Sequence, residues 1–203
     1  MGKTIAQKII ADHLISGDMT KGSEVALRID QTLTQDATGT MAYLELEAMG
    51  IPQVKTELSV SYVDHNMMQN GPENRNDHLY LQSVGANKGV IFSPPGNGIC
   101  HQLHLERFGI PGKTLIGSDS HTRYGALGTM AVGEGGPELV KQLLDKTYDV
   151  DMPEIVAVYL KGKLRKGVGP HDVALALVKA TFKSGFVKNK VLEFIGGGIK
   201  GLS

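Results

Sequence analysis

Apolar and polar positions alternate with two different periods along most of the sequence. Thr4 and Gln7 form a capping box, and the apolar stripe that begins at Ile5 predicts a first helix that Gly17 ends. Short runs rich in Val, Ile and Leu then alternate with longer stretches of helical spacing. They predict strands at 24–30, 58–63, 89–92 and 113–117 and helices at 41–49, 77–84, 100–108 and 138–146.

Strands that alternate with helices are typical of an α/β fold with a largely parallel sheet. The polar residues 34–39 are predicted to form a turn. The pattern restarts after residues 149–153, which mark a plausible domain boundary. Residues 1–150 are therefore predicted to form a first α/β domain, and residues 151–203 the opening β-α-β part of a second, incomplete one.

Three elements are expected in this second part of the chain. Residues 154–160 are almost wholly apolar, which predicts a strand buried on both faces. A helix is expected to begin at 169–172 and to end at Gly185, followed by a strand at 191–195. A piece of only about 50 residues is short for an independent core.

Composition excludes several classes of protein. Lys plus Arg and Asp plus Glu both number 21, so no basic excess points to a nucleic acid or an anionic membrane. The single cysteine excludes a disulfide framework, and it excludes a structural zinc or iron–sulfur site built from this chain's own thiolates. No apolar run reaches the ~18 residues needed to span a bilayer, and the first residues lack the apolar core of a signal peptide. We expect a cytoplasmic protein.

Clusters of Asp, Ser and His follow the ends of predicted strands or loops. They are Asp64-His65, His101 and Asp119-Ser120-His121. Because ligands bind at the carboxyl ends of strands in open α/β sheets, these clusters are expected to converge on one pocket. A histidine beside a carboxylate is a tunable proton donor or acceptor, and two such pairs offer an acid and a base.

Each of these clusters also has a purely structural interpretation. An Asp-His pair in a loop is commonly a turn or a helix cap, His101 can bond backbone at a helix start, and residues 118–122 can cap a helix. The remaining histidines are interpreted as lying at helix surfaces or N-termini without polar partners. They are His13, His78, His104 and His171.

A metal-based interpretation and a thiol-based one also exist. His65, His101 and His121 with a carboxylate would suit zinc or non-haem iron in a mononuclear hydrolase, although their spacing is not that of a tight helical motif. Cys100 precedes His101, but a buried free thiol is the commoner outcome. The glycine runs 133–136 and 196–201 lack the Lys and Ser/Thr of a phosphate-binding P-loop.

Taken in order, three motifs resemble the aconitase family, which includes aconitases, homoaconitases and isopropylmalate isomerases. They are the Gln-Asp-Ala-Thr motif at 35–38, Asp64-His65 and the block from Gly96 to Thr122. The resemblance implies a three-layer α/β/α first domain, part of three domains around a [4Fe–4S] cluster with a fourth, mobile domain. It also implies reversible removal and re-addition of water on a hydroxy-polycarboxylate such as citrate or isocitrate, in tricarboxylic acid metabolism.

Roles carry over to the matching positions of this sequence. The resemblance implies that Gln35 binds a substrate carboxylate and that His65, oriented by Asp64, protonates the departing hydroxyl. It also implies that His101 pairs with Asp119. The implied catalytic residues are Asp64, His65, His101, Asp119, His121 and Glu193. The implied substrate-binding residues are Gln35, Asp119, Ser120, His121 and Asn189.

Two of these roles reach into the second predicted domain. His121 is implied to pair with Glu193 in the strand 191–195, and Asn189, four residues earlier, matches an asparagine near the iron. The three cysteines that hold the family's cluster, one alone and then a CxxC pair, lie beyond the matching region, so no metal ligand is assigned. Arg123-Tyr124 stands where better-known members have a small residue or proline, which suggests a hydratase-like branch.

These departures lead to two expectations for the function of this chain. The first is the N-terminal portion of an aconitase-type hydro-lyase, which is inactive and binds no cluster by itself; a separate chain that carries the cluster and swivel domains is a candidate partner. The second is a non-catalytic module that binds a polycarboxylate or docks on a cluster-bearing partner. In both, the ligand is a small hydroxy-polycarboxylate.

Overall fold

Five parallel strands form the central sheet of the computed structural model, which describes residues 2–202. Their order across the sheet is β5-β4-β3-β6-β7, and each neighbouring pair is parallel. The strands are β3 (Gln31–Gln35), β4 (Leu58–Tyr62), β5 (Ile91–Ser93), β6 (Thr114–Gly117) and β7 (Met130–Gly133). The α/β prediction with a largely parallel sheet is therefore confirmed.

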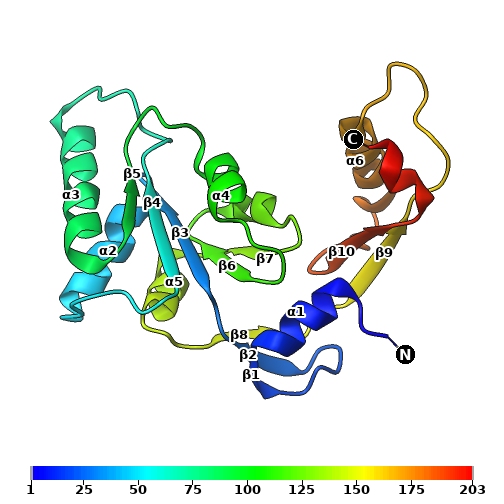
Figure 1. Ribbon diagram of the computed structural model, residues 1–203, viewed down its shortest axis with the longest axis horizontal. Helices are drawn as coiled ribbons and strands as arrows, with labels where there is room; N and C mark the ends of the chain where they lie inside the picture. Colours follow the sequence, from blue (N-terminus) through cyan, green and yellow to red (C-terminus); the bar gives the residue numbers. More distant parts are fainter. Residues whose placement is uncertain (1, 203) are drawn as a thin grey trace.

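Helices cover both faces of this sheet, which makes the three-layer arrangement visible in Figure 1. One face carries α2 (Gly39–Ala48), α3 (Pro72–Lys88) and α5 (Gly136–Leu143), and the other carries α4 (Cys100–Phe108) beside the short 3-10 helix η1 (Ser120–Gly125). The helix α3 is longer than the predicted 77–84. It begins with Pro72 in its first turn and ends at Gly89, whose φ of 78° suits a left-handed C-cap.

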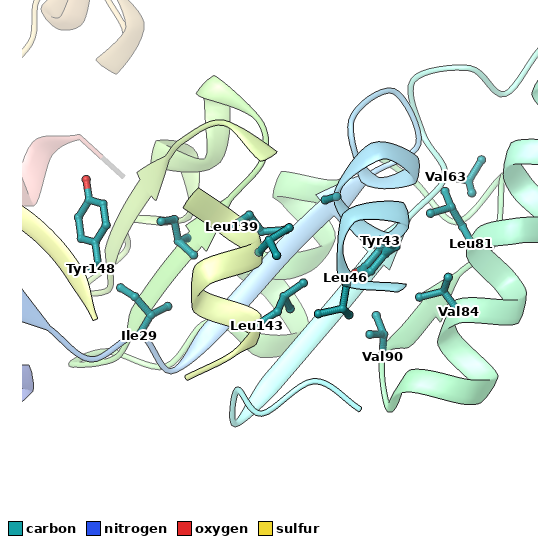
Figure 2. Close-up of a cluster of buried hydrophobic side chains, with 13 residues drawn as sticks. Ile29, Tyr43, Leu46, Val63, Leu81, Val84, Val90, Leu139, Leu143 and Tyr148 are labelled. Atoms are coloured by element: carbon teal, nitrogen blue, oxygen red, sulfur yellow. The ribbon is translucent and has the colours of Figure 1, made fainter. Parts of the chain in front are cut away.

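The larger hydrophobic core lies between the sheet and the layer of α2, α3 and α5. Figure 2 shows Tyr43 and Leu46 of α2 among side chains of the two neighbouring helices, including Leu81 and Leu139. All four are at most 1% exposed. A smaller core on the opposite face contains Leu33, Val60, Tyr62, Cys100, Leu103 and Leu115. Burial of apolar side chains on both faces accounts for the stability of the sheet.

The central strand β3 includes the first two residues of the turn predicted at 34–39, and the turn itself occupies residues 36–38. All five residues of β3 are buried, although four of them are polar. Their hydroxyl groups find partners on neighbouring elements: Thr32 bonds Ser59 at 2.6 Å, and Thr34 bonds the Tyr43 hydroxyl at 3.1 Å. Buried polar groups are tolerated when they are hydrogen-bonded, so a strand of this composition can occupy the middle of a sheet.

The N-terminal residues form a second, antiparallel sheet that the sequence pattern did not predict. Helix α1 (Ile5–His13) has the expected Thr4–Gln7 capping box, but it ends at His13 rather than at Gly17. The chain continues directly as β1 (Leu14–Gly17), which pairs with β2 (Glu24–Leu27), and β2 pairs in turn with β8 (Tyr148–Asp151). The pairing of β1 with β2 therefore competes successfully with extension of the helix.

The last part of the chain is a small β-α-β unit. It consists of β9 (Ile155–Tyr159), α6 (Pro170–Thr181), β10 (Val191–Ile195) and the 3-10 helix η2 (Gly197–Gly201). The two strands are parallel and form a sheet of their own, set apart from the central sheet in Figure 1. The strand prediction at 154–160 is confirmed, but its burial is not, because Tyr159 is 60% exposed and no residue of β9 is buried.

The domain boundary near residues 149–153 stays a prediction. Contacts do join the β9–α6–β10 unit to the preceding chain: Lys21 pairs with Glu154 at 2.6 Å, and Glu193 accepts a hydrogen bond from the Ala6 backbone. Within residues 2–202, no helix combines the length and apolar character needed to cross a bilayer.

Candidate functional site

The ends of β3, β4 and β6 bring most of the predicted site residues together. From β3 the chain proceeds to β4 and β5 on one side and then returns to β6 on the other side of β3. Loops that leave two adjacent strands in opposite directions open a crevice at their carboxyl ends, where ligands bind in α/β folds. Gln35 ends β3, and Asp119 follows β6 by two residues, so both lie at this point.

Side chains from the ends of β3 and β4, from α4 and from η1 contact the Asp119 carboxylate. Its Oδ1 lies 3.2 Å from His101 Nε2 and 3.1 Å from His121 Nδ1, and its Oδ2 lies 3.4 Å from His65 Nε2. The Gln35 side-chain amide donates to the same Oδ2 at 3.3 Å. The expectation that the three imidazoles converge is therefore confirmed, while the roles assigned to them stay predictions.

Asp64 ties the loop after β4 to the start of α4. Its Oδ1 lies 2.8 Å from His65 Nδ1, and its Oδ2 accepts a hydrogen bond of 2.6 Å from the Cys100 backbone N–H. The residue before α4 is Ile99, which offers no side-chain cap, so Asp64 supplies the acceptor for this helix N-terminus. One carboxylate thus positions both His65 and, through α4, His101.

His65 and His101 are shifted in opposite directions by the same environment. Burial lowers the pKa of His65, but the hydrogen bond and charge of Asp64, with the charges of Asp119 and Asp36, outweigh it and raise that pKa overall. For His101, burial outweighs the attraction of Asp119 and lowers the pKa. The site therefore pushes the pKa values of these two histidines apart, upward for His65 and downward for His101.

The pKa of Asp119 itself is lowered although the carboxyl is partly buried. Burial raises the pKa, but the His121 backbone N–H, the Gln35 amide, the charge of His101 and the hydrogen bond from the His121 side chain outweigh that effect. The backbone hydrogen bond from His121 is 2.6 Å long and also caps η1. Asp119 is thus held as a carboxylate at the centre of the site.

An open cavity of about 960 Å³ adjoins the shared carboxylate. His101 and His121 line it with rings 6.2 Å apart, and Ser120 lies beside them. The remaining lining residues are Ile99, Gln102, Arg123 and Tyr124. His121 is exposed, with 81% of its side chain accessible, so the histidine cluster can be reached from solvent. A small ligand can enter here.

Glu193 and Asn189 do not join the cluster. Glu193 Oε1 accepts a hydrogen bond of 2.7 Å from the Ala6 backbone N–H, and no bond links it to His121 in residues 2–202. Asn189 is exposed in the turn before β10, where its φ of 55° is left-handed. The pairing of Glu193 with His121 and the role of Asn189 stay predictions.

Two groups of side chains have ligand atoms close enough to hold a metal ion. One is Asp64, His65 and Cys100, and the other is His101, Asp119 and His121. In both groups the histidine nitrogens that face the carboxylates are engaged in hydrogen bonds. Cys100 is a buried free thiol, as predicted, and burial raises its pKa, with Asp64 adding to the effect.

Three histidines that the sequence pattern placed on helix surfaces are in fact buried and have polar neighbours. His13 lies 2.7 Å from the Asp30 carboxylate, and His104 contacts the Tyr62 hydroxyl and the Gln31 side chain, each at 3.1 Å. His78 is buried as well. Their helices turn these faces toward the cores, which the coarse apolar periodicity did not reveal because histidine is not counted as apolar.

Asp36 is the functional residue that reasoning from the sequence missed. It directly follows β3, and its buried carboxylate accepts hydrogen bonds from three consecutive backbone N–H groups at residues 64–66. Its position beside Gln35, at the same strand end as the predicted cluster, was the available signal.

Comparison with known proteins gives one family and several relatives. The family model described as "Aconitase family (aconitate hydratase)" matches residues 7–203. The mitochondrial aconitate hydratase of Schizosaccharomyces pombe is 34% identical over 216 residues, covering 98% of this chain and 27% of that protein. The 3-isopropylmalate dehydratase large subunit of Elusimicrobium minutum is 35% identical over 206 residues, covering 100% of this chain and 48% of that protein.

A third relative resembles the second in name and coverage. The 3-isopropylmalate dehydratase large subunit 2 of Archaeoglobus fulgidus is 36% identical over 198 residues, which cover 97% of this chain and 47% of that protein. The chain therefore spans about a quarter of the mitochondrial relative and about half of the two large subunits.

Proposed function

This chain belongs to the aconitase family, and we propose that it carries the histidine–carboxylate part of a hydro-lyase active site that acts on a hydroxy-polycarboxylate. The observation that carries the proposal is the Asp119 carboxylate, which lies within 3.4 Å of ring nitrogens of His65, His101 and His121. The names of the relatives, aconitate hydratase and 3-isopropylmalate dehydratase, support the reaction class.

The chemistry of dehydration requires what His65 can supply. A hydroxyl group leaves a carbon as water only when it gains a proton, so the reaction needs an acid beside the breaking C–O bond. The pKa of His65 is raised because Asp64, Asp119 and Asp36 outweigh its burial, so its imidazole holds a proton to higher pH than an ordinary histidine does. In the reverse direction the neutral imidazole takes a proton from the incoming water. His65 is therefore proposed as the acid for hydroxyl departure.

His101 has a different part in this proposal. Burial lowers its pKa, and its Nε2 faces Asp119 Oδ1 at 3.2 Å. A neutral imidazole that donates to Asp119 fixes one oxygen of the carboxylate, so that the other remains oriented toward His65. Pairs of titratable groups whose pKa values are pushed apart by their environment are typical of acid–base sites.

Substrate carboxylates and hydroxyls would be bound by the neighbouring polar groups. The Gln35 amide has a second N–H besides the one that it donates to Asp119, and the Ser120 hydroxyl borders the cavity. The cavity of about 960 Å³ is large enough for citrate, isocitrate or 2-isopropylmalate.

The [4Fe–4S] cluster that the family implies does not fit a site built by this chain alone. Such a cluster is held by cysteine thiolates, and this chain has one cysteine. Cys100 is fully buried, and burial raises its pKa, so the thiol stays protonated. We propose that a further polypeptide segment, in the same protein or in a separate chain, supplies the cluster and the remaining substrate ligands.

A ligand titration of the 203-residue chain tests this function. Imidazole resonances of His65, His101 and His121 are followed by NMR while citrate, isocitrate or 2-isopropylmalate is added. We expect saturable shifts with at least one of the three. Ser120→Ala should weaken that binding by about tenfold, as expected for loss of one hydrogen bond to a charged group. Ser83→Ala, which changes an exposed hydroxyl on α3, is the matched control.

The absence of saturable shifts with all three acids would contradict the proposal. Turnover is measured separately from the ultraviolet absorbance of the unsaturated product. After treatment with iron and sulfide, the chain alone is expected to give none, because one thiol cannot hold the cluster. Dehydration by the chain alone would overturn the proposal that a further polypeptide segment supplies the cluster. Binding without turnover once a cluster-bearing segment is supplied would instead favour a non-catalytic binding module.

A further inference from the structure

The loop that carries His65 is held from behind by a second carboxylate. Asp36 Oδ1 accepts hydrogen bonds of 2.9 Å from the backbone N–H groups of both Asp64 and His65, and Oδ2 accepts one of 2.6 Å from Asn66. The Asp36 side chain is 1% exposed. Hydrogen bonds to a buried carboxylate are charge-assisted and strong, so Asp36 fixes three consecutive residues of this loop.

A buried histidine of α3 faces the same carboxylate. His78 Nε2 lies 3.9 Å from Asp36 Oδ2, and both side chains are 1% exposed. On the other side of the ring, Nδ1 lies 3.3 Å from the side-chain amide nitrogen of Gln69. An amide nitrogen only donates, so Nδ1 is the acceptor and the ring proton lies on Nε2, which points toward Asp36. This N–H has no hydrogen-bond partner in residues 2–202.

We propose that His78 is a positioning residue that completes the environment of Asp36 and thereby holds His65 in the histidine cluster. A carboxylate offers about four lone-pair directions, and the N–H groups of residues 64–66 occupy three of them. The His78 Nε2–H is the donor available for the fourth. A small inward movement closes the 3.9 Å separation, which a buried donor without another partner favours.

The connection from His78 to the reacting group passes through a short series of bonds. His78 faces Asp36, Asp36 holds the backbone of Asp64 and His65, and Asp64 Oδ1 in turn orients His65 Nδ1 at 2.8 Å. Replacing His78 is expected to loosen the Asp36 carboxylate and, as a consequence, the loop at residues 64–66. The orientation of His65 is therefore expected to depend on a side chain that never touches the substrate.

The chain offers a matched control in a second buried His–Asp pair. His13 Nε2 lies 2.7 Å from Asp30 Oδ2, and both side chains are at most 5% exposed. The bonds of Asp30 go to the backbone and side chains of β6 and of its own neighbours, and none goes to residues 64–66 within the described chain. Replacing His13 disrupts a comparable pair and is expected to destabilise the fold without releasing the His65 loop.

Amide exchange and histidine titration on the 203-residue chain test the proposal. In His78→Leu, the N–H groups of residues 64–66 are expected to exchange about tenfold faster or more, the effect of losing a hydrogen bond to a charged group. The pKa of His65 is expected to fall toward its ordinary value as Asp64 loses its orientation. His78→Gln keeps an N–H donor at the position of the His78 Nε2–H, so the exchange rates and the pKa of His65 should both return to wild-type values. His13→Leu should leave amide exchange at residues 64–66 within about twofold of the wild type.

Two results would overturn this role for His78. One is that amide exchange at residues 64–66 and the pKa of His65 stay unchanged in His78→Leu, or change equally in His13→Leu. The other needs no variant: long-range proton–nitrogen spectra of the wild type should place the His78 proton on Nε2, and a proton on Nδ1 contradicts the proposal. If His78→Leu fails to fold, the proton–nitrogen spectrum of the wild type and the amide exchange of His78→Gln still test the proposal. The importance of His78 for catalysis rests on the proposed function. Because these measurements use no ligand, the positioning role of His78 and the proposed function can each be contradicted without the other.

Discussion

Helices α5 and α6 both carry Leu and Val side chains, but these side chains are buried in α5 and exposed in α6. In α5, four of the eight residues are buried, and Leu139 and Leu143 are fully enclosed in the larger core. In α6, no residue is buried, and Leu175 and Val178 are each 54% exposed. The helix α5 packs on strands of the five-stranded sheet, whereas α6 connects the two strands of a two-stranded sheet.

The difference shows what an apolar pattern can and cannot tell. The pattern indicates which face of an element needs a partner, and in α5 that face is buried. It does not indicate whether the partner lies in the same chain, because a two-stranded parallel sheet is too small to bury a helix face. The β9–α6–β10 unit therefore exposes large apolar side chains, with Phe182 at 80%. The five-stranded region carries the stability of the molecule.

Core truncations should give the largest contrast between the two regions. Leu46→Ala in α2 removes a fully buried side chain and is expected to lower the free energy of unfolding by about 2–5 kcal/mol. Leu175→Ala in α6 removes a half-exposed side chain, and the expected change is within about 0.5 kcal/mol. Urea denaturation followed by circular dichroism measures both. Equal losses would contradict the assignment of stability to the five-stranded region.

Acid should also lower the free energy of unfolding of the five-stranded region, by less than the largest loss expected for Leu46→Ala. Burial, helped by the charge of His101, lowers the pKa of His104 from 6.5 to about 4. Between these values the unfolded chain binds a proton that the folded chain excludes, so stability is present above pH 6.5 and is lost as the pH falls toward 4. Each pKa unit is worth about 1.4 kcal/mol, so lowering the pH from 7 to 5 is expected to cost about 2 kcal/mol.

The variant His104→Gln isolates this contribution. Its stability should fall less than that of the wild type between pH 7 and pH 5, by about the same 2 kcal/mol. Peptide-resolved hydrogen exchange should locate the acid effect in residues 24–133 and not in the β9–α6–β10 unit, where His171 is exposed. Identical pH dependence in the wild type and the variant would show that His104 is not kept neutral by burial.

The order of helices and strands could largely be predicted because most elements here have a regular apolar period. The central strand β3 is the instructive failure. Its Thr32, Thr34 and Gln35 are polar, and only the three-dimensional pairing with Ser59, Tyr43 and Asp119 makes their burial favourable. A polar side chain with a remote partner looks the same in the sequence as one that faces water, so local pattern cannot distinguish the two cases.

The candidate site was predictable to the extent that its residues follow strand ends. His65, His101 and His121 could be brought together because parallel strands place their carboxyl ends at one edge of a sheet. Asp36 also follows a strand end, but the contacts of Asp36 and His78 could not be predicted this way, because they are defined by backbone N–H groups at residues 64–66 and by burial in α3. Neither feature leaves a mark on the sequence.

The convergence of three histidines on Asp119 is tested most directly by histidine titration of Asp119→Asn. The Asp119 charge raises the pKa of both His65 and His101, so both values should fall together when it is removed. Asp172→Asn, which removes a carboxylate from α6, serves as the matched control and should leave both values in place. Titration curves of His65 and His101 that stay unchanged in Asp119→Asn would show that the carboxylate is not shared, and the proposed site would lose its centre.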